Sequence, residues 1–371
     1  MSQLQNISVV LPSLDPDEKL IAVVDGLLEY GFTDIILVND GSKAENMHWF
    51  EEADRHPEVH LLHHEVNRGK GVALKTAFTW FLENRPDHIG VVTVDGDNQH
   101  HPEDTRACAL HMAKHELLTL GVRDFSLPHV PARSRKGNRI TSAVFKIFCG
   151  MEISDTQTGL RAIPRKDLEV LNKVKGDRFE YETNMLLALR ENGIPFDEVK
   201  IRTVYIEENK SSHFRVIRDS WRIYKLILAH FFKYTVSSLL SSVVDTALYA
   251  LMNLLCKNSL TGLALTAIPF LVARVISAIV NFVMNKKLVF NSSEGTGKAL
   301  AKYVMVAIPT AALQVALTHG VYMLFSIGES QTFLRTLIYV CVMTALFFLS
   351  YVLQERWVFL PKKPAVRKED K

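Results

Sequence analysis

The chain has 371 residues, 48% of them hydrophobic, and a formal net charge of +3. This length allows two domains of ordinary size, and the near-neutral charge gives no reason to expect a nucleic-acid partner. The four cysteines show no CxxC spacing, which argues against a zinc site or a disulfide framework and suits a reducing cytosol. The N-terminus has no basic segment followed by a long apolar run, so we expect no signal peptide and a cytosolic first domain.

Strand and helix patterns alternate in the first half of the sequence. Apolar, β-branched runs predict strands at 7–12, 34–40, 59–64, 88–95, 117–123 and 200–206. Helical patterns lie between them at 17–30, 70–84 and 102–114. This alternation predicts an α/β domain with a mostly parallel sheet and helices on both faces. Such sheets bind ligands at the carboxyl ends of their strands.

Polar residues follow the predicted strand ends. The first strand ends at Pro12, shortly before Asp15, and the second runs into Asn39-Asp40-Gly41-Ser42. The third leads into Asn67-Arg68-Gly69-Lys70-Gly71, and the fourth ends in Asp95-Gly96-Asp97-Asn98-Gln99. Neither GxGxxG nor GxxxxGK[ST] occurs, so the sequence supports neither dinucleotide binding nor a P-loop.

The Asp95-x-Asp97 pair is a candidate metal site. Mg²⁺ or Mn²⁺ takes one or two carboxylates and completes its shell with water and substrate phosphates. Gln99 could add an amide oxygen. The alternative is a surface turn, since Asp-Gly-Asp-Asn is ordinary turn sequence, but the position at the end of an apolar strand favours a metal.

A set of motifs resembles the family 2 glycosyltransferases and follows their order: VVLPSLDPDEKL, VNDGS, NRGKGVALKTA, VDGDNQHHPED, DTQTGLR and RFEYETNMLLA. The resemblance covers about residues 5–225 and points to the polyprenyl-phosphate branch, which includes dolichol-phosphate mannose synthases and bactoprenol glucosyltransferases. It implies a GT-A-like fold, a nucleotide-sugar donor, a polyprenyl-phosphate acceptor and Mg²⁺ or Mn²⁺. Leu14-Asp15-Pro16 and Asn39 depart from the family's usual residues near the base, so the base stays open.

The same resemblance implies residue roles around the donor. It places nucleotide contacts at Pro12, Asp15, Asp17, Asp40, Lys70 and Asp95. It places a metal on the diphosphate, held by Asp95, Asp97 and Gln99. Helix N-capping is an equal alternative for Asp15 and Asp17, and Lys70 is alternatively a solvated lysine at a helix start.

The resemblance places the acceptor side at a basic segment after the fifth strand. Arginine forks suit phosphate recognition, and the candidates that act with Asp97 in catalysis are Arg123, Arg135 and Arg139. A solvated basic loop near an anionic membrane is the alternative. Asp155 belongs to a motif that faces the acceptor in relatives, or it is a turn aspartate. Because a lipid phosphate is already ionised near neutral pH, Asp155 need only orient groups or hold charge. Glu180 and Glu182 belong to the same motif set without a clear role, and both could open a helix.

Residues 213–232 predict an amphipathic helix at the membrane surface. One stripe is basic (Arg215, Arg218, Arg222 and Lys225) and another is apolar and aromatic (Ile217, Trp221, Tyr224, Leu228 and Phe231). An ordinary packed helix is the alternative, but the apolar segment that comes next favours the interfacial one.

Four apolar segments come after it, at about 234–256, 264–285, 303–326 and 333–354, each long enough to cross a bilayer. Basic residues gather between the second and third segments and after the fourth. This predicts a multi-pass cell-membrane protein whose catalytic domain and both termini are cytosolic. The predicted parts are a catalytic domain (1–212), the interfacial helix (213–232), a membrane domain (233–360) and a basic tail (361–371).

The membrane half contains an internal repeat with a spacing of 69 residues, since NFVMNKKLVF from Asn281 aligns with SYVLQERWVF from Ser350. The repeat predicts two helical hairpins of the same orientation. This half resembles the GtrA-like family, proposed to move lipid-linked sugars or anchor their synthases. Asp245 and Arg274 fall at about the same depth in the first two spans, so we expect them to pair, in a structural more than a transport role.

These features predict an inverting hexosyltransferase that moves a hexose from a nucleotide sugar of the UDP-glucose or GDP-mannose type to undecaprenyl or dolichyl phosphate, for cell-surface glycan synthesis. The alternative is a lipid-linked sugar flippase with an attached sugar-binding domain, although a transporter needs no metal for a leaving group. A processive polysaccharide synthase is disfavoured because no QxxRW-type motif occurs. Assembly into a homo-oligomer stays open.

Overall fold

The computed structural model describes residues 3–202 except 129, residue 225, and residues 228–359 except 257, 260, 261, 293, 329 and 330. The chain forms two compact units, Met1–Ile227 and Leu228–Lys371. The predicted interfacial helix (213–232) lies mostly outside the described residues, and the predicted basic tail (361–371) lies wholly outside them.

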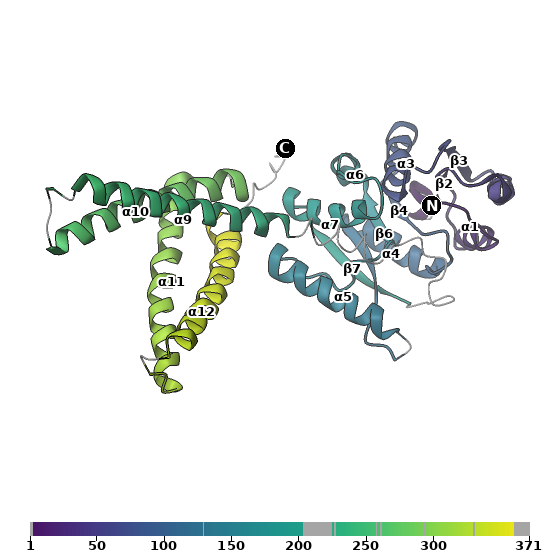
Figure 1. The fold of residues 1–371 in the computed structure, drawn as a ribbon. Helices are drawn as coiled ribbons and strands as arrows, with labels where there is room; N and C mark the ends of the chain where they lie inside the picture. The colour runs from purple at the N-terminus through teal and green to yellow at the C-terminus, as the bar shows by residue number, and fades with distance from the viewer. Residues whose placement is uncertain are drawn as a thin grey trace. The chain divides into compact units, whose positions relative to one another are not determined.

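A seven-stranded sheet forms the centre of the first unit (Figure 1). Its strands are β1 (Ile7–Ser13), β2 (Ile35–Asn39), β3 (Val59–His63), β4 (Gly90–Thr93), β5 (Leu118–Arg123), β6 (Arg161–Pro164) and β7 (Phe196–Ile201). They lie in the order β3-β2-β1-β4-β6-β5-β7, and only β6 runs antiparallel to its neighbours. The predicted α/β fold with a mostly parallel sheet is confirmed.

Helices cover both faces of this sheet. They are α1 (Lys19–Glu29), α2 (Met47–Ala53), α3 (Lys70–Asn84), α4 (Pro102–His115), α5 (Ala132–Val144), α6 (Arg165–Asn172) and α7 (Glu180–Asn192), with short turns at Gln3–Asn6, Ala44–Asn46 and Phe145–Cys149. Successive strand residues point to opposite faces. Val9 and Leu11 therefore pack in a core with α1 and α4, while Val10 joins a second core with α3 and α7.

Three parts of the first unit differ from the sequence prediction. The last strand is β7 and not 200–206, because it pairs with β5 in a register that runs from Leu118 opposite Phe196 to Arg123 opposite Ile201. Residues 203–206 lie outside the described residues. The antiparallel β6 was not predicted. The basic segment at 133–139 lies within α5 and is not a loop.

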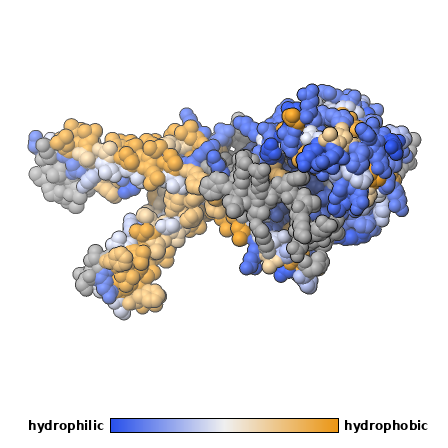
Figure 2. All heavy atoms as spheres, turned by 45° about the vertical axis from the view of Figure 1, so that its right-hand side comes forward, coloured by the Kyte–Doolittle hydropathy of each residue, from blue (hydrophilic) through white to orange (hydrophobic). Residues whose placement is uncertain are grey.

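Four long apolar helices form the second unit, as predicted. They are α9 (Ala229–Cys256), α10 (Gly262–Met284), α11 (Thr296–Leu324) and α12 (Thr332–Leu353), and π-helical turns continue α10 as Asn285–Val289 and α12 as Gln354–Val358. Each contains a stretch long and apolar enough to cross a membrane. Figure 2 shows apolar side chains over most of their visible surface.

The hairpins α9–α10 and α11–α12 meet at one end and diverge from it (Figure 1). At that end the Tyr234 hydroxyl donates to Ser350 Oγ (3.3 Å), and the Tyr303 hydroxyl donates to Asn281 Oδ1 (3.0 Å). Tyr303 lies 69 positions after Tyr234, and Ser350 lies 69 positions after Asn281. The two bonds are therefore equivalent under the repeat: in each, the tyrosine of one hairpin bonds a residue of the other hairpin. This arrangement explains why the repeat is visible in the sequence.

A second set of contacts joins residues that are themselves repeat equivalents. Asn285 Nδ2 donates to Gln354 Oε1 (3.0 Å), and the rings of Phe290 and Phe359 stack with centroids 5.3 Å apart. Gln354 Nε2 also donates to the Tyr234 hydroxyl (3.1 Å). We call Tyr234, Asn281, Asn285, Tyr303, Ser350 and Gln354 the hairpin junction. Its members come from all four helices or the turns that extend them.

The predicted charge pair inside the spans is confirmed. Arg274 Nη2 lies 3.3 Å from Asp245 Oδ2, and Ser277 Oγ donates to Asp245 Oδ1 (2.8 Å). The aspartate thus has two partners on α10. Such pairing offsets part of the cost of placing a charge inside an apolar span.

Candidate active site

Three predicted strand ends meet at one edge of the sheet. β1 pairs with β2 up to Ser13 opposite Asn39, and with β4 up to Val10 opposite Thr93. The backbone N–H of Asp40 donates to the Ser13 carbonyl (2.9 Å), so the loops after β1 and β2 begin side by side. The polar loops after β1, β2 and β4 therefore lie at the carboxyl edge, where open α/β sheets bind ligands.

Asp95, the first carboxylate of the predicted metal pair, lies two residues beyond β4 and contacts a lysine. Lys70 Nζ lies 2.7 Å from Asp95 Oδ1 and 3.0 Å from Glu182 Oε1. The side chains of Lys70 and Glu182 are 17% and 16% exposed, so water screens this pair less than it would at the surface. The β4 loop, the start of α3 and the start of α7 thus supply one charged cluster.

Burial and neighbouring charges set the protonation of this cluster. Burial raises the pKa of Asp95, but Lys70 and His100 outweigh it and hold the pKa well below its ordinary value. Burial lowers the pKa of Lys70, but Asp95 and Glu182 outweigh it and raise that pKa. Burial, followed by the charge of Asp95, raises the pKa of Asp97. Asp95 is therefore ionised and Lys70 protonated at neutral pH, while a cation beside Asp97 would relieve the repulsion between the two carboxylates.

The two carboxylates fit a hard divalent cation. Asp97 Oδ1 accepts a hydrogen bond from the backbone N–H of Gln99 (3.1 Å), in a turn where Asn98 has a φ of 59°. Among the residues that the structure describes, no group of three or more His, Cys, Asp or Glu side chains could hold a metal. Zinc takes three or four protein ligands, whereas Mg²⁺ is bound by one or two carboxylates together with substrate phosphates and water. The donor set fits the predicted cation.

Gly159 and Arg161 support Asp95 from β6 and the loop before it. A Cβ atom on Gly159 would lie 2.5 Å from Asp95 Oδ2, so the close approach requires glycine. The buried Arg161 donates through Nη1 to the Glu182 carbonyl (2.7 Å). Its Nη2 is buried without a partner among the described residues. The Arg161 guanidinium thus places a buried positive charge next to the backbone of Glu182.

Asp40 holds the loop that leads into α3. Its carboxylate accepts hydrogen bonds from the backbone N–H groups of Arg68 (3.0 Å) and Gly69 (2.7 Å). His64 Nδ1 lies 2.7 Å from Asp40 Oδ1, and the Asp40 side chain is 5% exposed. The buried carboxylate therefore fixes the backbone next to Lys70.

The remaining predicted donor residues lie around the end of β1. Asp15 has a φ of 47°, and its Oδ1 accepts from the backbone N–H of Lys43 (2.8 Å) in the loop after β2. Asp17 accepts from the backbone N–H of Lys19 (3.0 Å) and pairs with its ammonium (2.7 Å), while the N-cap of α1 is Glu18, without a side-chain cap bond. Pro12 is half-buried in β1.

Asp155 and Arg123 form a buried two-pronged pair at the end of β5. Arg123 Nε donates to Asp155 Oδ2 (2.7 Å), and Nη2 donates to Oδ1 (3.1 Å). Asp155 Oδ1 also accepts from the backbone N–H of Gln157 (3.0 Å). The Asp155 side chain is 0% exposed and that of Arg123 is 18% exposed. The carboxylate therefore fixes the plane of the guanidinium while part of that guanidinium meets solvent.

Helix α5 is tied to the same loop. Asn138 Nδ2 donates to the Ser154 carbonyl (2.6 Å), and Asn138 Oδ1 accepts from the backbone N–H of Thr156 (3.2 Å), on either side of Asp155. Arg135 donates to two carbonyls of the loop before α5, at 2.9 and 3.3 Å, and Arg139, one residue beyond Asn138, is exposed. The structure fixes Arg123 firmly and gives Arg139 access to solvent.

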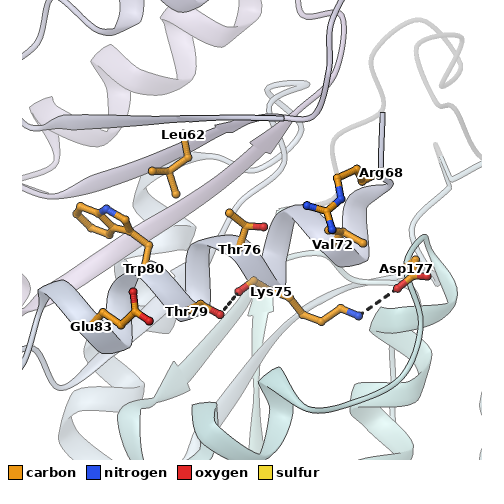
Figure 3. Close-up of a pocket in the computed structure, with 9 residues that line it drawn as sticks. All are labelled: Leu62, Arg68, Val72, Lys75, Thr76, Thr79, Trp80, Glu83 and Asp177. Carbon is orange, nitrogen blue, oxygen red and sulfur yellow. Dashed lines mark hydrogen bonds and ion pairs between the residues drawn. The ribbon is translucent and has the colours of Figure 1, made fainter. Parts of the chain in front are cut away.

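A separate groove of about 530 Å³ lies along α3 (Figure 3). It is lined by Leu62, Arg68, Val72, Lys75, Thr76, Thr79, Trp80, Glu83 and Asp177. Lys75 Nζ lies 3.2 Å from Asp177 Oδ1 across it. It contains none of the predicted site residues.

Four residues around the candidate site had no assigned role in the sequence prediction: His100, Asn138, Arg161 and Glu182. Glu182 stands in the first turn of α7, where an acidic residue is ordinarily explained by the helix dipole. His100 Nε2 lies 3.7 Å from Asp95 Oδ2, and the only sequence signal for it was its place just after the metal motif. Asn138, Arg161 and Glu182 make contacts with residues at least 16 positions away in the chain, which no local pattern reveals.

Family models match both units. The model described as glycosyl transferase family 2 matches residues 8–171. The model described as the GtrA/DPMS transmembrane domain matches residues 233–359. A solved structure similar to the first unit is a glucosyl-3-phosphoglycerate synthase from Mycobacterium tuberculosis in complex with uridine diphosphate, with a TM-score of 0.48 and 15% identity over 61% of this chain and 79% of that one.

Curated relatives match about three fifths of the chain. The uncharacterized protein MJ1222 of Methanocaldococcus jannaschii is 28% identical over 61% of this chain and 93% of its own length. The UDP-N-acetylglucosamine–dolichyl-phosphate N-acetylglucosaminyltransferase of Methanococcus voltae is 25% identical over 60% and 95%, and the dolichyl-phosphate beta-glucosyltransferase ALG5A of Trichomonas vaginalis is 22% identical over 60% and 73%. With its four apolar helices, the chain is therefore a membrane glycosyltransferase that joins a family 2 domain of GT-A-like fold to a GtrA/DPMS transmembrane domain.

Proposed function

We propose that the protein transfers a hexose from a nucleotide sugar to a polyprenyl phosphate, with inversion at the anomeric carbon. The observation that carries this proposal is the placement of two charged groups on neighbouring parts of one sheet edge. The Asp95–Asp97 pair follows β4, and the Arg123 fork ends β5, with only β6 between the two strands. Two relatives that bear dolichyl phosphate in their names support the choice of acceptor.

The donor side takes the nucleotide diphosphate. A divalent cation bound by Asp95 and Asp97, with Gln99 close by, would neutralise the diphosphate as it leaves. Lys70 adds a second positive charge at the same place. Pro12, Asp15 and Asp17 surround the nucleoside, and Asp40 contributes through the loop backbone that it holds.

The acceptor side binds the lipid phosphate. A phosphate oxygen forms the new bond to the anomeric carbon, and the bond from that carbon to the diphosphate breaks with its electron pair going to the nucleoside diphosphate. The attacking oxygen is already ionised near neutral pH, so no general base is required. Arg123 binds this phosphate, with charge from Arg135 and Arg139, and Asp155 is a positioning residue because Arg123 engages both of its oxygens.

We infer the membrane orientation from basic residues near the hairpin junction. Lys286, Lys287, Lys298 and Lys302 lie between the second and third spans, and the Asn285–Gln354 bond places the end of the fourth span at the same side. Basic residues flank spans on the cytosolic side. We therefore expect this end of the helices, the catalytic domain and both termini to be cytosolic.

A lipid-product assay tests the function. Full-length protein in detergent is incubated with undecaprenyl or dolichyl phosphate and, in separate reactions, radiolabelled UDP-glucose, GDP-mannose and UDP-N-acetylglucosamine, and lipids are extracted. We expect one donor to label the lipid, and Asp97→Ala to abolish labelling while Asp87→Ala, an exposed aspartate before β4, does not. Undiminished labelling by Asp97→Ala would overturn the metal assignment. Sugar binding without lipid product from any donor would support the flippase alternative instead.

A further inference from the structure

The ammonium of Lys70 is shared by two carboxylates from different elements. Lys70 opens α3, Asp95 follows β4, and Glu182 lies in the first turn of α7. The two Nζ–oxygen distances are 2.7 Å to Asp95 and 3.0 Å to Glu182. The lysine thus occupies one of the positions around the Asp95 carboxylate from which a metal ion could bind it.

The backbones that carry Lys70 and Glu182 are closely packed. Gly69 has a φ of 100°, and a Cβ there would overlap the Asp177 carbonyl oxygen. A Cβ on Gly71 would lie 2.6 Å from the Tyr181 Cβ. Lys70 therefore sits between two glycines that let the start of α3 approach the start of α7. Only the side chains remain free to adjust the distances within the cluster.

We propose that Glu182 is a positioning residue whose carboxylate draws Lys70 partly away from Asp95, and that Lys70 competes with the divalent cation for Asp95. This inference rests on the proposed metal role of Asp95 and Asp97. A cation on a carboxylate oxygen would lie within about 2.0–2.6 Å of it. The ammonium on the same oxygen repels such a cation, and the low exposure of the cluster strengthens the repulsion.

Donor and cation binding are coupled through this lysine. A diphosphate gives the ammonium another anion to bind, so the donor relieves the competition at Asp95. By linkage, the cation must then favour the donor by the same factor. Glu182 gives Lys70 a partner throughout, so the ammonium need not lose all of its contacts when it moves from Asp95.

Direct Mn²⁺ titration of the full-length protein without donor tests the inference. Lys70→Gln keeps an amide donor between the carboxylates and removes the charge, so we expect Mn²⁺ to bind about tenfold more tightly, equivalent to about 1.4 kcal/mol. Lys70→Met is the second variant in case the amide disturbs the fold. Glu182→Gln leaves the ammonium to Asp95 alone, so we expect weaker Mn²⁺ binding. Matched controls are Lys75→Met, on the same helix in the groove of Figure 3, and Glu180→Gln, on the same turn of α7, and both should bind Mn²⁺ as the unchanged protein does.

A double-mutant cycle tests whether Glu182 affects Mn²⁺ binding by positioning Lys70 or only through its own negative charge. If Glu182 acts through Lys70, the effect of Glu182→Gln disappears in the Lys70→Gln background. Persistence of the full effect there, or a Lys70→Gln protein that binds Mn²⁺ no more tightly, overturns the inference while leaving the proposed function intact. Mn²⁺ binding that is absent from the unchanged protein, or unaffected by Asp97→Ala, overturns the metal assignment itself and the inference with it.

Discussion

Replacing Asp155 with asparagine probes the arginine at the end of β5. In the structure both carboxylate oxygens accept from Arg123, through Nε at 2.7 Å and Nη2 at 3.1 Å. Asparagine keeps the size of the side chain but removes its charge and converts one acceptor into a donor. One of the two bonds becomes a contact between donors, so the guanidinium must turn away from the plane that Asp155 imposes.

The loss of stability expected from Asp155→Asn depends on how deeply the Asp155–Arg123 pair is buried. Removing one partner of a buried ion pair costs about 3–5 kcal/mol, because the other charge stays behind without its partner. Arg123 is 18% exposed, so water recovers part of this cost, and we expect a loss near the lower bound, about 3 kcal/mol. For a domain of about 150–250 residues, a loss of about 3 kcal/mol lowers the Tm by about 6–12 °C.

Thermal unfolding and acceptor kinetics measure the two consequences. The Tm of the full-length protein in detergent should fall by that amount, and the KM for polyprenyl phosphate should rise by about tenfold while the KM for the nucleotide sugar changes by less than about twofold. Glu152→Gln is the matched control, because its pair with Lys146 is 76% and 63% exposed and should change neither quantity. An unchanged Tm, or an equal rise in both KM values, would show that Asp155 does not position an acceptor-binding arginine.

Three further changes test other parts of the structure. Gly159→Ala puts a methyl group 2.5 Å from Asp95 Oδ2 and should lower Mn²⁺ affinity, measured by titration, with little change in Tm because the carboxylate can turn. Burial raises the pKa of the Cys108 thiol to about 12, so iodoacetamide at about pH 8 should leave it unmodified until the protein unfolds, as read by mass spectrometry. Gln354→Leu removes a buried partner of Asn285 and Tyr234 and should destabilise the second unit by about 1–3 kcal/mol in detergent unfolding, whereas Gln314→Leu, half-exposed on α11, should not.

The local sequence pattern was sufficient for most of the parallel sheet. Strands β1 and β2 are almost continuously apolar, as burial on both faces of a parallel sheet requires, whereas β3 at the edge of the sheet contains two histidines and is only partly buried. Helix α3 has the predicted bounds because glycine and lysine at 69–70 mark its start. Strand β6 was missed because four residues, one of them a buried arginine, show no period of their own. Strand β7 is polar at Asp197, Glu198 and Lys200, and its pairing with β5 sets its register.

The candidate site was also predictable from the sequence only in part. The Asp95–Asp97 pair was identifiable because both ligand candidates lie in one turn. The partners that hold these residues come from distant segments. Lys70 meets Glu182 across 112 positions of sequence, and Asp155 meets Arg123 across 32. Such contacts depend on how the helices pack against the sheet, which spacing within one segment does not specify.

The hairpin junction has a consequence for how the membrane domain is made. Tyr234 is hydrogen-bonded to Ser350, which lies 116 residues later in the chain. Ribosomes add about 5–20 residues per second, so about 6 to 23 s pass between synthesis of the two partners. During that interval the first hairpin is already long enough to enter the bilayer, while the Tyr234 hydroxyl still lacks its partners Ser350 and Gln354. The nascent domain therefore needs either a polar contact within the insertion machinery or retention at the headgroup layer until the fourth helix emerges.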